Sequence, residues 1–535
     1  MKEALEIFKE IKKNNKWDEN SLQKILRKYP KEGKGLYRHD ELVAAYKDLV
    51  KKELIEEDKG IEDRIRLKPT RTQSGVAIVT VLMKPYPCPG ECIFCPNMSN
   101  MPKSYIASEP GAQRALTYDF NPYDQTKYRI KALRDTGHNT DKIELIVLGG
   151  TCSTYPENYQ IWFIKRCFDA MNSFDREYQP KDISEDSITW DDLYKAQKFN
   201  ETAKCRNVGL VLETRPDFIT ENEIIRMRKL GATKVQIGVQ ALDDEILELN
   251  RRGHTVNDTK EAFRLLRTAG FKIHAHIMPN LYGSNLKRDI DDYKKLWSKE
   301  FSPDELKIYP TSILPDTELH ELYQKGDYKP YTEDELLEYF TKTLPHTPRY
   351  VRLTRIIRDI PSDEIVAGNK ATNFRQIAEQ RIEELGLKIE DIRSREIKGE
   401  EISWEDIEKE IITYKTTVST EYFISYKTKK DDKICGFLRL SIPKKEISKN
   451  NFIDELRDSS IIREVHVYGS LVSIGEDSEG KPQHLGLGKE MMKRAEEISK
   501  NSSFKKISVI SAIGTRKYYE KRGFERGELY MNKAL

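Results

Sequence analysis

Three thiols stand close together in the stretch Cys88-Pro-Gly-Glu-Cys-Ile-Phe-Cys95, a C-x3-C-x2-C array. Thiolates are soft ligands suited to iron or zinc, so these cysteines can converge on one small inorganic centre. A structural zinc site is normally closed by four protein groups, and no fourth Cys or His lies nearby in the sequence. A 4Fe-4S cluster held by Cys88, Cys92 and Cys95 would instead keep one iron open. On spacing alone, a zinc knuckle and three unrelated thiols remain alternatives.

The cysteine array resembles the signature of radical S-adenosylmethionine (SAM) enzymes. Phe94 supplies the aromatic residue that this family carries just before its last cysteine. In that family the open iron is chelated by the amino acid end of SAM. The resemblance therefore implies two cofactors, a 4Fe-4S cluster and SAM.

Length and composition limit the number of domains and the classes of protein to which the chain can belong. A chain of 535 residues should hold two or three domains. Lys and Arg number 91 against 88 Asp and Glu, so any nucleic-acid surface must come from local clustering. Seven cysteines, three of them in one array, argue for a reducing compartment. No apolar run could span a bilayer, and Met1-Lys-Glu-Ala opens a charged helical pattern and no signal peptide. We expect a cytoplasmic protein with no membrane partner.

Residues 1–70 predict a small, basic helical domain. Up to about Asp63, apolar residues such as Leu5, Ile7 and Phe8 recur at helical spacing with lysines between them. The stretch Arg64-Ile-Arg-Leu-Lys-Pro-Thr-Arg71 then places four cations in eight residues. Such a concentration suits phosphate contacts that do not read sequence, although a charge run is often only a solvated helix face.

Residues 71–361 alternate strand-like runs with helical patterns. Residues 76–83 are apolar throughout, as in a strand buried on both faces of a parallel sheet. The cysteine loop follows the C-terminal end of this run, where βα barrels carry their chemistry. Further runs lie at residues 143–148, 207–212, 234–238, 273–277 and 305–309. This alternation predicts a partial (β/α) barrel.

Three of these runs end in residues that could face a cofactor, at residues 149–151, 213–216 and 238–240. The Gly-Gly pair of the first resembles the motif by which radical SAM proteins contact the SAM amino group, although a lone Gly-Gly is more often a turn. Four arginines then follow at three-residue spacing, either as a basic stripe or as salt-bridge partners: Arg349, Arg352, Arg355 and Arg358. We expect a linker at residues 362–387, with a helix near residues 374–385.

Residues 388–535 predict a second, different domain. Strand-like runs at residues 422–426, 435–442 and 461–474 precede Gln483-His-Leu-Gly-Leu-Gly488, which opens a predicted helix at residues 489–499. This Q-x-x-G-x-G spacing lets backbone N–H groups approach a pyrophosphate at a helix N-terminus. A predicted strand at residues 507–511 and a helix and turn at residues 515–524 follow. The order resembles the GNAT superfamily of N-acetyltransferases, so we predict a GNAT-type α/β domain that binds acetyl-CoA.

The chain contains both motifs, and over nearly its whole length it resembles the catalytic subunit of Elongator. The stretches that carry this resemblance are residues 68–75, 84–89, 463–469 and 514–519. That resemblance implies modification of the wobble uridine of tRNA at carbon 5. In the mechanism proposed for the family, the reduced cluster cleaves SAM to a radical that removes hydrogen from the methyl group of acetyl-CoA. The carbon radical adds to uridine, and thioester hydrolysis leaves 5-carboxymethyluridine. The implied partners are the tRNA anticodon stem-loop, bound in part by residues 1–70, and an external electron donor.

The resemblance also assigns residues. Cys88, Cys92 and Cys95 match the cluster ligands. Tyr519 and Lys142 match residues placed close to the reacting acetyl-CoA, and Lys142 could also be a plain surface lysine. The full acetyl-CoA set implied by the family is Lys142, Glu464, Val465, His466, Val467, Leu487, Gly488, Lys489 and Tyr519.

Two rival functions and one departure follow from the same residues. A protein lysine acetyltransferase with a structural iron-sulfur cluster would need a base near the amine, and Glu464 could serve. A noncatalytic tRNA-binding scaffold is the second rival, and the intact cysteine array and CoA loop count against it. Some relatives carry a cysteine-bearing zinc site between their domains, but no cysteine lies between Cys205 and Cys435, so we predict no such site. Whether the chain forms a homodimer is left open.

Overall fold

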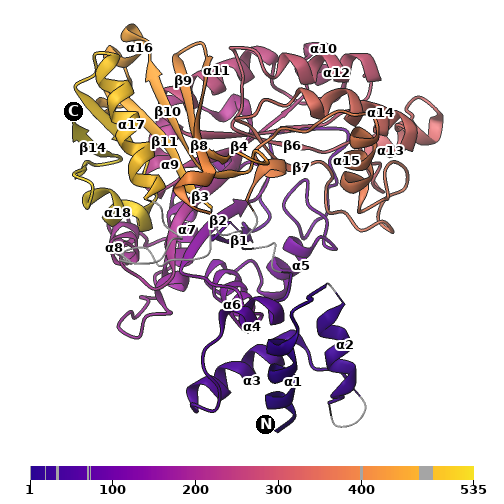
Figure 1. The fold of residues 1–535 in the computed structure, drawn as a ribbon. Helices are drawn as coiled ribbons and strands as arrows, with labels where there is room; N and C mark the ends of the chain where they lie inside the picture. Colours follow the sequence, from indigo (N-terminus) through magenta and orange to yellow (C-terminus); the bar gives the residue numbers. More distant parts are fainter. Residues whose placement is uncertain are drawn as a thin grey trace.

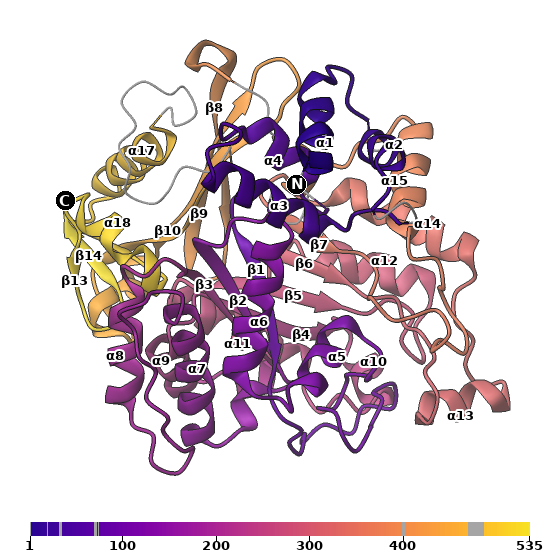
Figure 2. The ribbon, with the colours of Figure 1, turned by 90° about the horizontal axis from the view of Figure 1, so that it is seen from below.

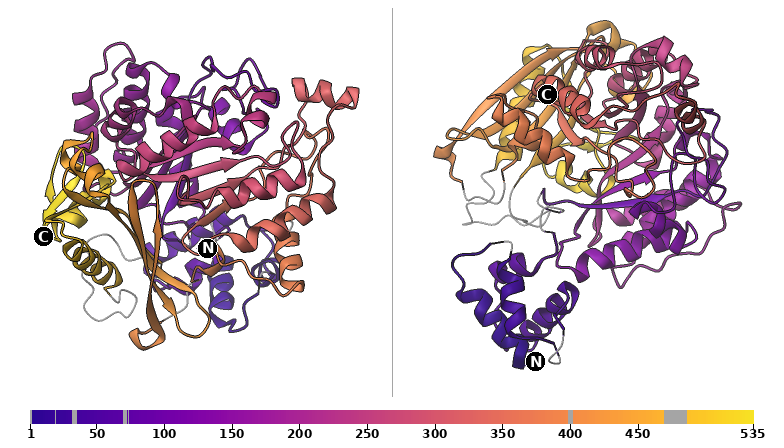
Figure 3. Two further views of the ribbon diagram at one scale, coloured as in Figure 1. Left: turned by 90° about the horizontal axis from the view of Figure 1, so that it is seen from above. Right: turned by 90° about the vertical axis from the view of Figure 1, so that its right-hand side faces the viewer.

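The computed structural model describes residues 2–18, 20–31, 35–68, 72, 74–397, 402–468 and 486–535. Its N-terminal region is a compact group of helices, α1 (Lys2–Lys13), α2 (Ser21–Lys28), α3 (His39–Lys51) and α4 (Lys59–Ile65). Ile7, Phe8 and Ile11 of α1 pack in a core that this group buries for itself. The group projects from one side of the molecule (Figure 3), where α3 contacts α6 (Pro122–Asp135) and Arg66 donates a hydrogen bond to the Gly137 carbonyl. The last three residues of the predicted basic stretch, 69–71, lie outside the described residues.

Within the described ranges, seven parallel strands form the first sheet in the order β1-β2-β3-β4-β5-β6-β7. They are β1 (Ala77–Leu82), β2 (Lys142–Leu148), β3 (Arg206–Thr214), β4 (Lys234–Gln240), β5 (Lys272–Ile277), β6 (Glu305–Ile308) and β7 (Arg352–Arg355). Strand order follows chain order, as right-handed βα units require. No pairing in the described part joins β1 to β7. The predicted partial barrel is therefore confirmed, and β7 is a strand that we expected only as a basic stripe.

Helices connect the barrel strands and cover the sheet (Figure 1). Their bounds are α5 (Pro110–Thr117), α6 (Pro122–Asp135), α7 (Glu157–Asn172), α8 (Trp190–Asn200), α9 (Glu221–Leu230), α10 (Asp244–Leu249), α11 (Val256–Thr268), α12 (Leu286–Lys295), α13 (Glu318–Lys325), α14 (Glu333–Thr343) and α15 (Phe374–Glu384). The expected linker at residues 362–387 contains α15. Because Phe374, Ala378 and Ile382 of α15 are buried in the same core as the barrel helices, this segment is packed structure.

The second sheet of the described chain has the order β13-β14-β12-β11-β10-β9-β8 (Figure 2). Its strands are β8 (Ile407–Lys415), β9 (Ser419–Thr428), β10 (Ile434–Pro443), β11 (Ser459–Val467), β12 (Lys506–Val509), β13 (Glu525–Arg526) and β14 (Met531–Ala534). Only β11 and β12 pair in parallel, so the sheet is mixed. Its helices are α16 (Lys445–Lys449), α17 (Leu487–Asn501) and α18 (Arg516–Glu520).

Two strands in this domain differ from expectation, one in its bounds and one because it was not predicted. The run predicted at residues 461–474 is β11, which begins earlier and ends at Val467, and residues 469–474 lie outside the described part. The strand β8 was not predicted, because its residues Glu408, Lys409 and Glu410 are charged and half-buried or exposed on the outer edge of the sheet. Among the described helices, none is both long and apolar enough to cross a membrane.

Buried ion pairs join the two domains. Asp304, just before β6, is fully buried and lies 2.8 Å from Arg463 of β11, 3.2 Å from Arg267 of α11 and 3.3 Å from Arg439 of β10. Arg463 also contacts Glu421 of β9 at 2.7 Å. Buried charges persist only where they are paired, so this cluster holds the second sheet against the N-terminal ends of the barrel strands.

Candidate active site

One cavity of about 2130 Å³ is lined by residues of both domains. At one end lie the three cysteines, and at the other lie the residues predicted to bind acetyl-CoA, including Glu464, Gly488 and Tyr519. The wall between these ends is the inner face of the barrel. Every sequence-predicted site residue therefore borders a single space, and their individual roles remain predictions.

The cysteine loop follows β1 and lies at the C-terminal ends of the strands. Arg252 Nη1 donates a hydrogen bond to Cys92 Sγ at 3.5 Å, and the backbone N–H of Gly90 donates to Cys88 Sγ at 3.4 Å. A hydrogen bond from the Cys95 thiol, followed by the charges of Arg252 and Arg215, lowers the pKa of Cys92 to about 5, against the opposing effect of burial. The same hydrogen bond, together with burial, raises the pKa of Cys95, so the surroundings favour thiolate, the form in which cysteine binds metal, at Cys92.

The surroundings of the loop fit an anionic iron-sulfur cluster. Arg215 Nη1 and Arg252 Nε are buried donors without a hydrogen-bond partner in the described structure, and both residues line the cavity. A Cβ on Gly90 would lie 2.4 Å from Arg215 Nη1, so only glycine lets this guanidinium approach the loop. The described residues contain no group of three His, Cys, Asp or Glu side chains arranged for a single metal ion. Three neighbouring thiols with no fourth Cys or His nearby in the sequence, beside the buried arginines Arg215 and Arg252, fit an anionic iron-sulfur cluster.

Neighbouring strand ends surround the same loop. Thr151 Oγ1, after β2, lies 4.0 Å from Cys88 Sγ, and Gly150 adopts a positive φ of 81° that favours glycine. Glu213 of β3 accepts a hydrogen bond from the Tyr105 hydroxyl at 2.6 Å. The predicted cofactor-facing ends at residues 149–151, 213–216 and 238–240 all contribute to the cavity lining.

The predicted acetyl-CoA strand lies at the opposite ends of the barrel strands. Glu464 of β11 accepts hydrogen bonds from Lys272 Nζ of β5 and from Arg439 Nε, both at 2.9 Å. Burial alone would raise its pKa, but Lys272 and Arg439 outweigh burial and lower the pKa of Glu464 to about 2. Burial lowers the pKa of His466 to about 4, and its ring stacks on Phe437 with centroids 5.6 Å apart. Val465 and Val467 are half-buried beside them and line the cavity.

The predicted pyrophosphate loop is described only from Gly486 onward, and residues 483–485 lie outside the described part. Leu487, Gly488 and Lys489 begin α17, whose N-terminus faces the cavity. A Cβ on Gly488 would lie 2.7 Å from the Tyr518 hydroxyl. The Tyr519 ring packs edge-on against Tyr518 at 5.2 Å, and burial raises its pKa.

Lys142 opens β2 and is half-buried. Burial lowers its pKa. Arg206, the register partner of Lys142, opens β3. Gly514 of the second domain packs directly against Arg206, since a Cβ added at Gly514 would lie only 2.6 Å from Arg206 Cβ. The structure thus brings Lys142 to the end of the barrel that the acetyltransferase domain covers. Lys142 and Glu464 are 322 positions apart in the chain.

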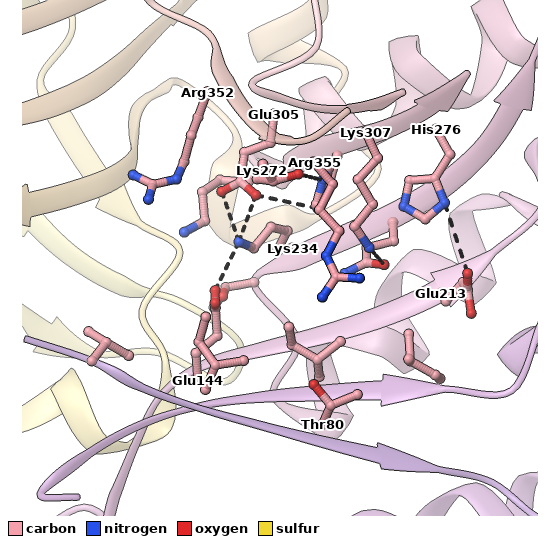
Figure 4. Close-up of a pocket in the computed structure, with 18 of the residues that line it drawn as sticks. Thr80, Glu144, Glu213, Lys234, Lys272, His276, Glu305, Lys307, Arg352 and Arg355 are labelled. Carbon is pink, nitrogen blue, oxygen red and sulfur yellow. Dashed lines mark hydrogen bonds and ion pairs between the residues drawn. The ribbon is translucent and has the colours of Figure 1, made fainter. Parts of the chain in front are cut away.

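The inner face of the barrel is polar along β4 to β7, a feature that the sequence reasoning missed (Figure 4), whereas β1 and β2 also contribute aliphatic residues such as Ile78 and Ile146 to the cavity lining. Lys234 of β4 pairs with Glu305 of β6 at 2.8 Å and with Glu144 of β2 at 2.9 Å. The signal was present in the sequence, because polar residues alternate with apolar ones in Lys142-Ile-Glu144, Lys234-Val-Gln236, Lys272-Ile-His274 and Glu305-Leu-Lys307. Period-two alternation marks a strand with one apolar and one polar face. This polar face spans roughly 20 Å between the two ends of the cavity.

Known proteins resemble this chain over most of its length. The pattern of the Radical SAM superfamily matches residues 86–296, and that of the Radical SAM C-terminal domain matches residues 303–384. The "tRNA uridine(34) acetyltransferase" of Methanocaldococcus infernus is 40% identical, over 99% of this chain and 98% of that protein. The "Elongator complex protein 3" of Homo sapiens is 35% identical, over 89% and 87%.

A solved structure gives the same result for the fold. The archaeal Methanocaldococcus infernus Elp3 with N-terminus deletion (1-46) superposes with a TM-score of 0.72 at 38% sequence identity, covering 86% of this chain and 99% of that one. Identity at this level over the barrel and the second sheet together extends well beyond a shared fold. The chain belongs to the family of the tRNA uridine(34) acetyltransferases and Elongator complex protein 3, within the Radical SAM superfamily.

Proposed function

We propose that this protein modifies uridine 34 of tRNA, converting it to 5-carboxymethyluridine with a carbon unit from acetyl-CoA. The observation that carries the proposal is the single cavity, which holds the cysteine loop at one end and the acetyl-CoA residues at the other. A radical formed at the cysteine end must meet both acetyl-CoA and a base. One shared cavity would let the protein hold all three reactants together.

Cys88, Cys92 and Cys95 would hold the 4Fe-4S cluster, with Arg215 and Arg252 balancing its charge. When bound, the cluster and SAM supply hydrogen-atom abstraction from the methyl group of acetyl-CoA. The chain's own residues bind and orient: the start of α17 receives the pyrophosphate, and the edge of β11 lies along the pantetheine arm. The barrel wall excludes bulk solvent from the reacting atoms.

The tRNA would approach with its anticodon loop, whose unstacked bases are easier to extrude than those of a helix. The basic N-terminal helices provide a surface for its phosphates, as proposed for residues 1–70. An external one-electron donor, which the chain does not supply, is needed to reduce the cluster.

The protein lysine acetyltransferase alternative is not favoured by the geometry of Glu464. A general base must have a pKa high enough to accept a proton near neutral pH. Both oxygens of Glu464 accept hydrogen bonds from cations, and those cations lower its pKa to about 2. Its carboxylate is therefore a structural anion that ties β11 to β5.

The test is anaerobic turnover of the reconstituted protein with reductant, SAM, methyl-labelled acetyl-CoA and unmodified tRNA, followed by nucleoside mass spectrometry. We expect label in a carboxymethyl group on uridine 34, abolished by Cys92→Ala and strongly reduced by Tyr519→Ala. Cys435→Ala, a buried cysteine outside the cavity lining, is the matched control and should retain activity. CoA release without any labelled nucleoside would overturn the proposal.

A further inference from the structure

Lys307 and Arg355 are two neighbouring cations on the inner wall of the barrel. They are register partners on β6 and β7. Both line the cavity, and both side chains point into it (Figure 4). Lys307 lies between Glu305, which belongs to the ion pairs nearer the acetyl-CoA end, and Tyr309, which lies towards the cysteine end. The pair therefore occupies the middle of the passage between the two ends.

Lys307 differs from the other two lysines at the centre of this wall in its partners. Lys234 pairs with two carboxylates and Lys272 with one, each within 3.0 Å. Within the described part of the chain, Lys307 has no carboxylate at ion-pair distance, and its Nζ donates to the amide oxygen of Gln236 at 2.8 Å. An ammonium has three N–H donors, so the charge and two donors are left for a ligand.

Arg355 adds a second cation beside the first. Its Nη1 pairs with Asp359 at 2.6 Å towards the mouth of the cavity, and its side chain is 46% exposed. Burial lowers the pKa of Lys307 to about 7; the negative charge of Glu213 opposes this shift, and the charge of Arg355 adds to it. Because Asp359 already pairs with Arg355, an anionic oxygen of a ligand would be bound mainly by Lys307, with Arg355 beside it.

We propose that Lys307 and Arg355 form the subsite for the acyl oxygen, binding it first as the thioester carbonyl and finally as the carboxylate of the product. This inference rests on the proposed function, which requires both species to occupy the cavity. The paired donors are suited to an oxygen that gains negative charge during reaction. In the hydrolytic step, water oxygen bonds to the carbonyl carbon and the carbon–sulfur bond breaks. The electron pair leaves on sulfur, which takes up a proton as CoA, and the step needs no oxidant or reductant.

The first experiment measures binding and needs neither cluster nor SAM. Two anticodon stem-loop RNAs are compared, one with 5-carboxymethyluridine at position 34 and one with 5-carbamoylmethyluridine, its uncharged isostere. We expect the wild-type protein to prefer the carboxylate by about tenfold, the range of one charge-assisted contact. Lys307→Met with Arg355→Met should reduce the preference to about one, and Lys307→Arg should retain part of it. The matched control is Lys260→Met, an exposed lysine on α11, which should leave the preference unchanged.

Equal affinity of the wild-type protein for the two RNAs would overturn the subsite. A preference that survives in the double variant would overturn it as well. If the wild-type protein modifies no tRNA but still prefers the carboxylate in a Lys307-dependent way, the proposed function fails and the subsite stands.

The second experiment separates a site for the acyl oxygen from a structural role. Turnover by Lys307→Met should accumulate a nucleoside that still carries CoA as a thioester, because hydrolysis loses its oxyanion contact. The melting temperature of Lys307→Met should equal or exceed that of the wild type, since the substitution removes a buried charge without a carboxylate partner. A lower melting temperature together with a normal ratio of carboxymethyl product to thioester would assign Lys307 to structure alone and overturn the proposal.

Discussion

At the scale of single residues, the partners of the charged side chains on the barrel wall show which of them are already ion-paired and which could bind a ligand. Glu464 is held by Lys272 and Arg439, and this fixes its protonation state far from neutral pH. Lys307 has no carboxylate partner at ion-pair distance in the described structure, and its pKa of about 7 lets it gain or lose a proton near neutral pH. A residue type alone does not distinguish the two cases, because the distinction comes from partners that lie far away in the sequence.

The paired state of Glu464 predicts how stability depends on pH. Its pKa is about 2 in the folded protein against an ordinary value of 4.5. A depressed carboxyl pKa contributes stability above the unfolded value and loses it as the pH falls towards the folded value. We therefore expect wild type to exceed Glu464→Gln in unfolding free energy at about pH 6, with the difference shrinking as the pH falls towards about 3. Urea unfolding across this range measures it, and a pH-independent difference would contradict the assignment.

At the scale of elements, the sequence predicted the six barrel strands from apolar runs and glycine or polar ends. It did not predict β7, because Arg352 and Arg355 on a strand of four residues look like a surface stripe until the barrel curves them inward. The cysteine array was recognisable because its ligands are local. The wall that joins the two ends of the cavity was not, since Lys234, Glu305 and Glu144 meet only when three strands are placed side by side.

The start of α17 predicts a specific steric effect. An alanine Cβ at position 488 would meet the Tyr518 hydroxyl at 2.7 Å, so Gly488→Ala should displace the helix start and raise the KM for acetyl-CoA by about tenfold. Iron content after reconstitution should not change. Tyr518→Phe removes the obstructing oxygen, and the double variant should recover most of the affinity. Gly35→Ala, where the nearest atom would be 4.0 Å away, serves as the control.

At the scale of the whole molecule, the two domains behave as one unit because Asp304 binds three arginines from both sides of the interface. The domain order was predictable from motifs. The way the domains dock was not predictable, because the interface includes buried charges, which composition alone assigns to the surface, as well as apolar contacts such as Gly231 against Ile513.

The interface predicts a large effect from one neutralised charge. Asp304→Asn would leave Arg267, Arg439 and Arg463 without their shared anion, and we expect a loss of about 3–5 kcal/mol in unfolding free energy. Asp48→Asn removes an exposed partner of Lys52 and should change stability by about 0.5 kcal/mol or less. Denaturant unfolding compares them. A small loss at Asp304 would show that the domains dock mainly through apolar contacts.

The ion-paired part of the barrel wall also affects how readily a radical in the cavity would abstract hydrogen from the protein itself. A carbon radical abstracts hydrogen most readily from weak C–H bonds, such as those beside sulfur or in tertiary aliphatic side chains. The ammonium N–H bonds of Lys234 and Lys272 are strong by comparison, and carboxylates such as Glu144 and Glu305 present oxygen without hydrogen. The ion-paired side of the lumen would therefore present few weak C–H bonds to a radical at the acyl group, whereas the side lined by Ile78, Ile146 and Met278 would present more.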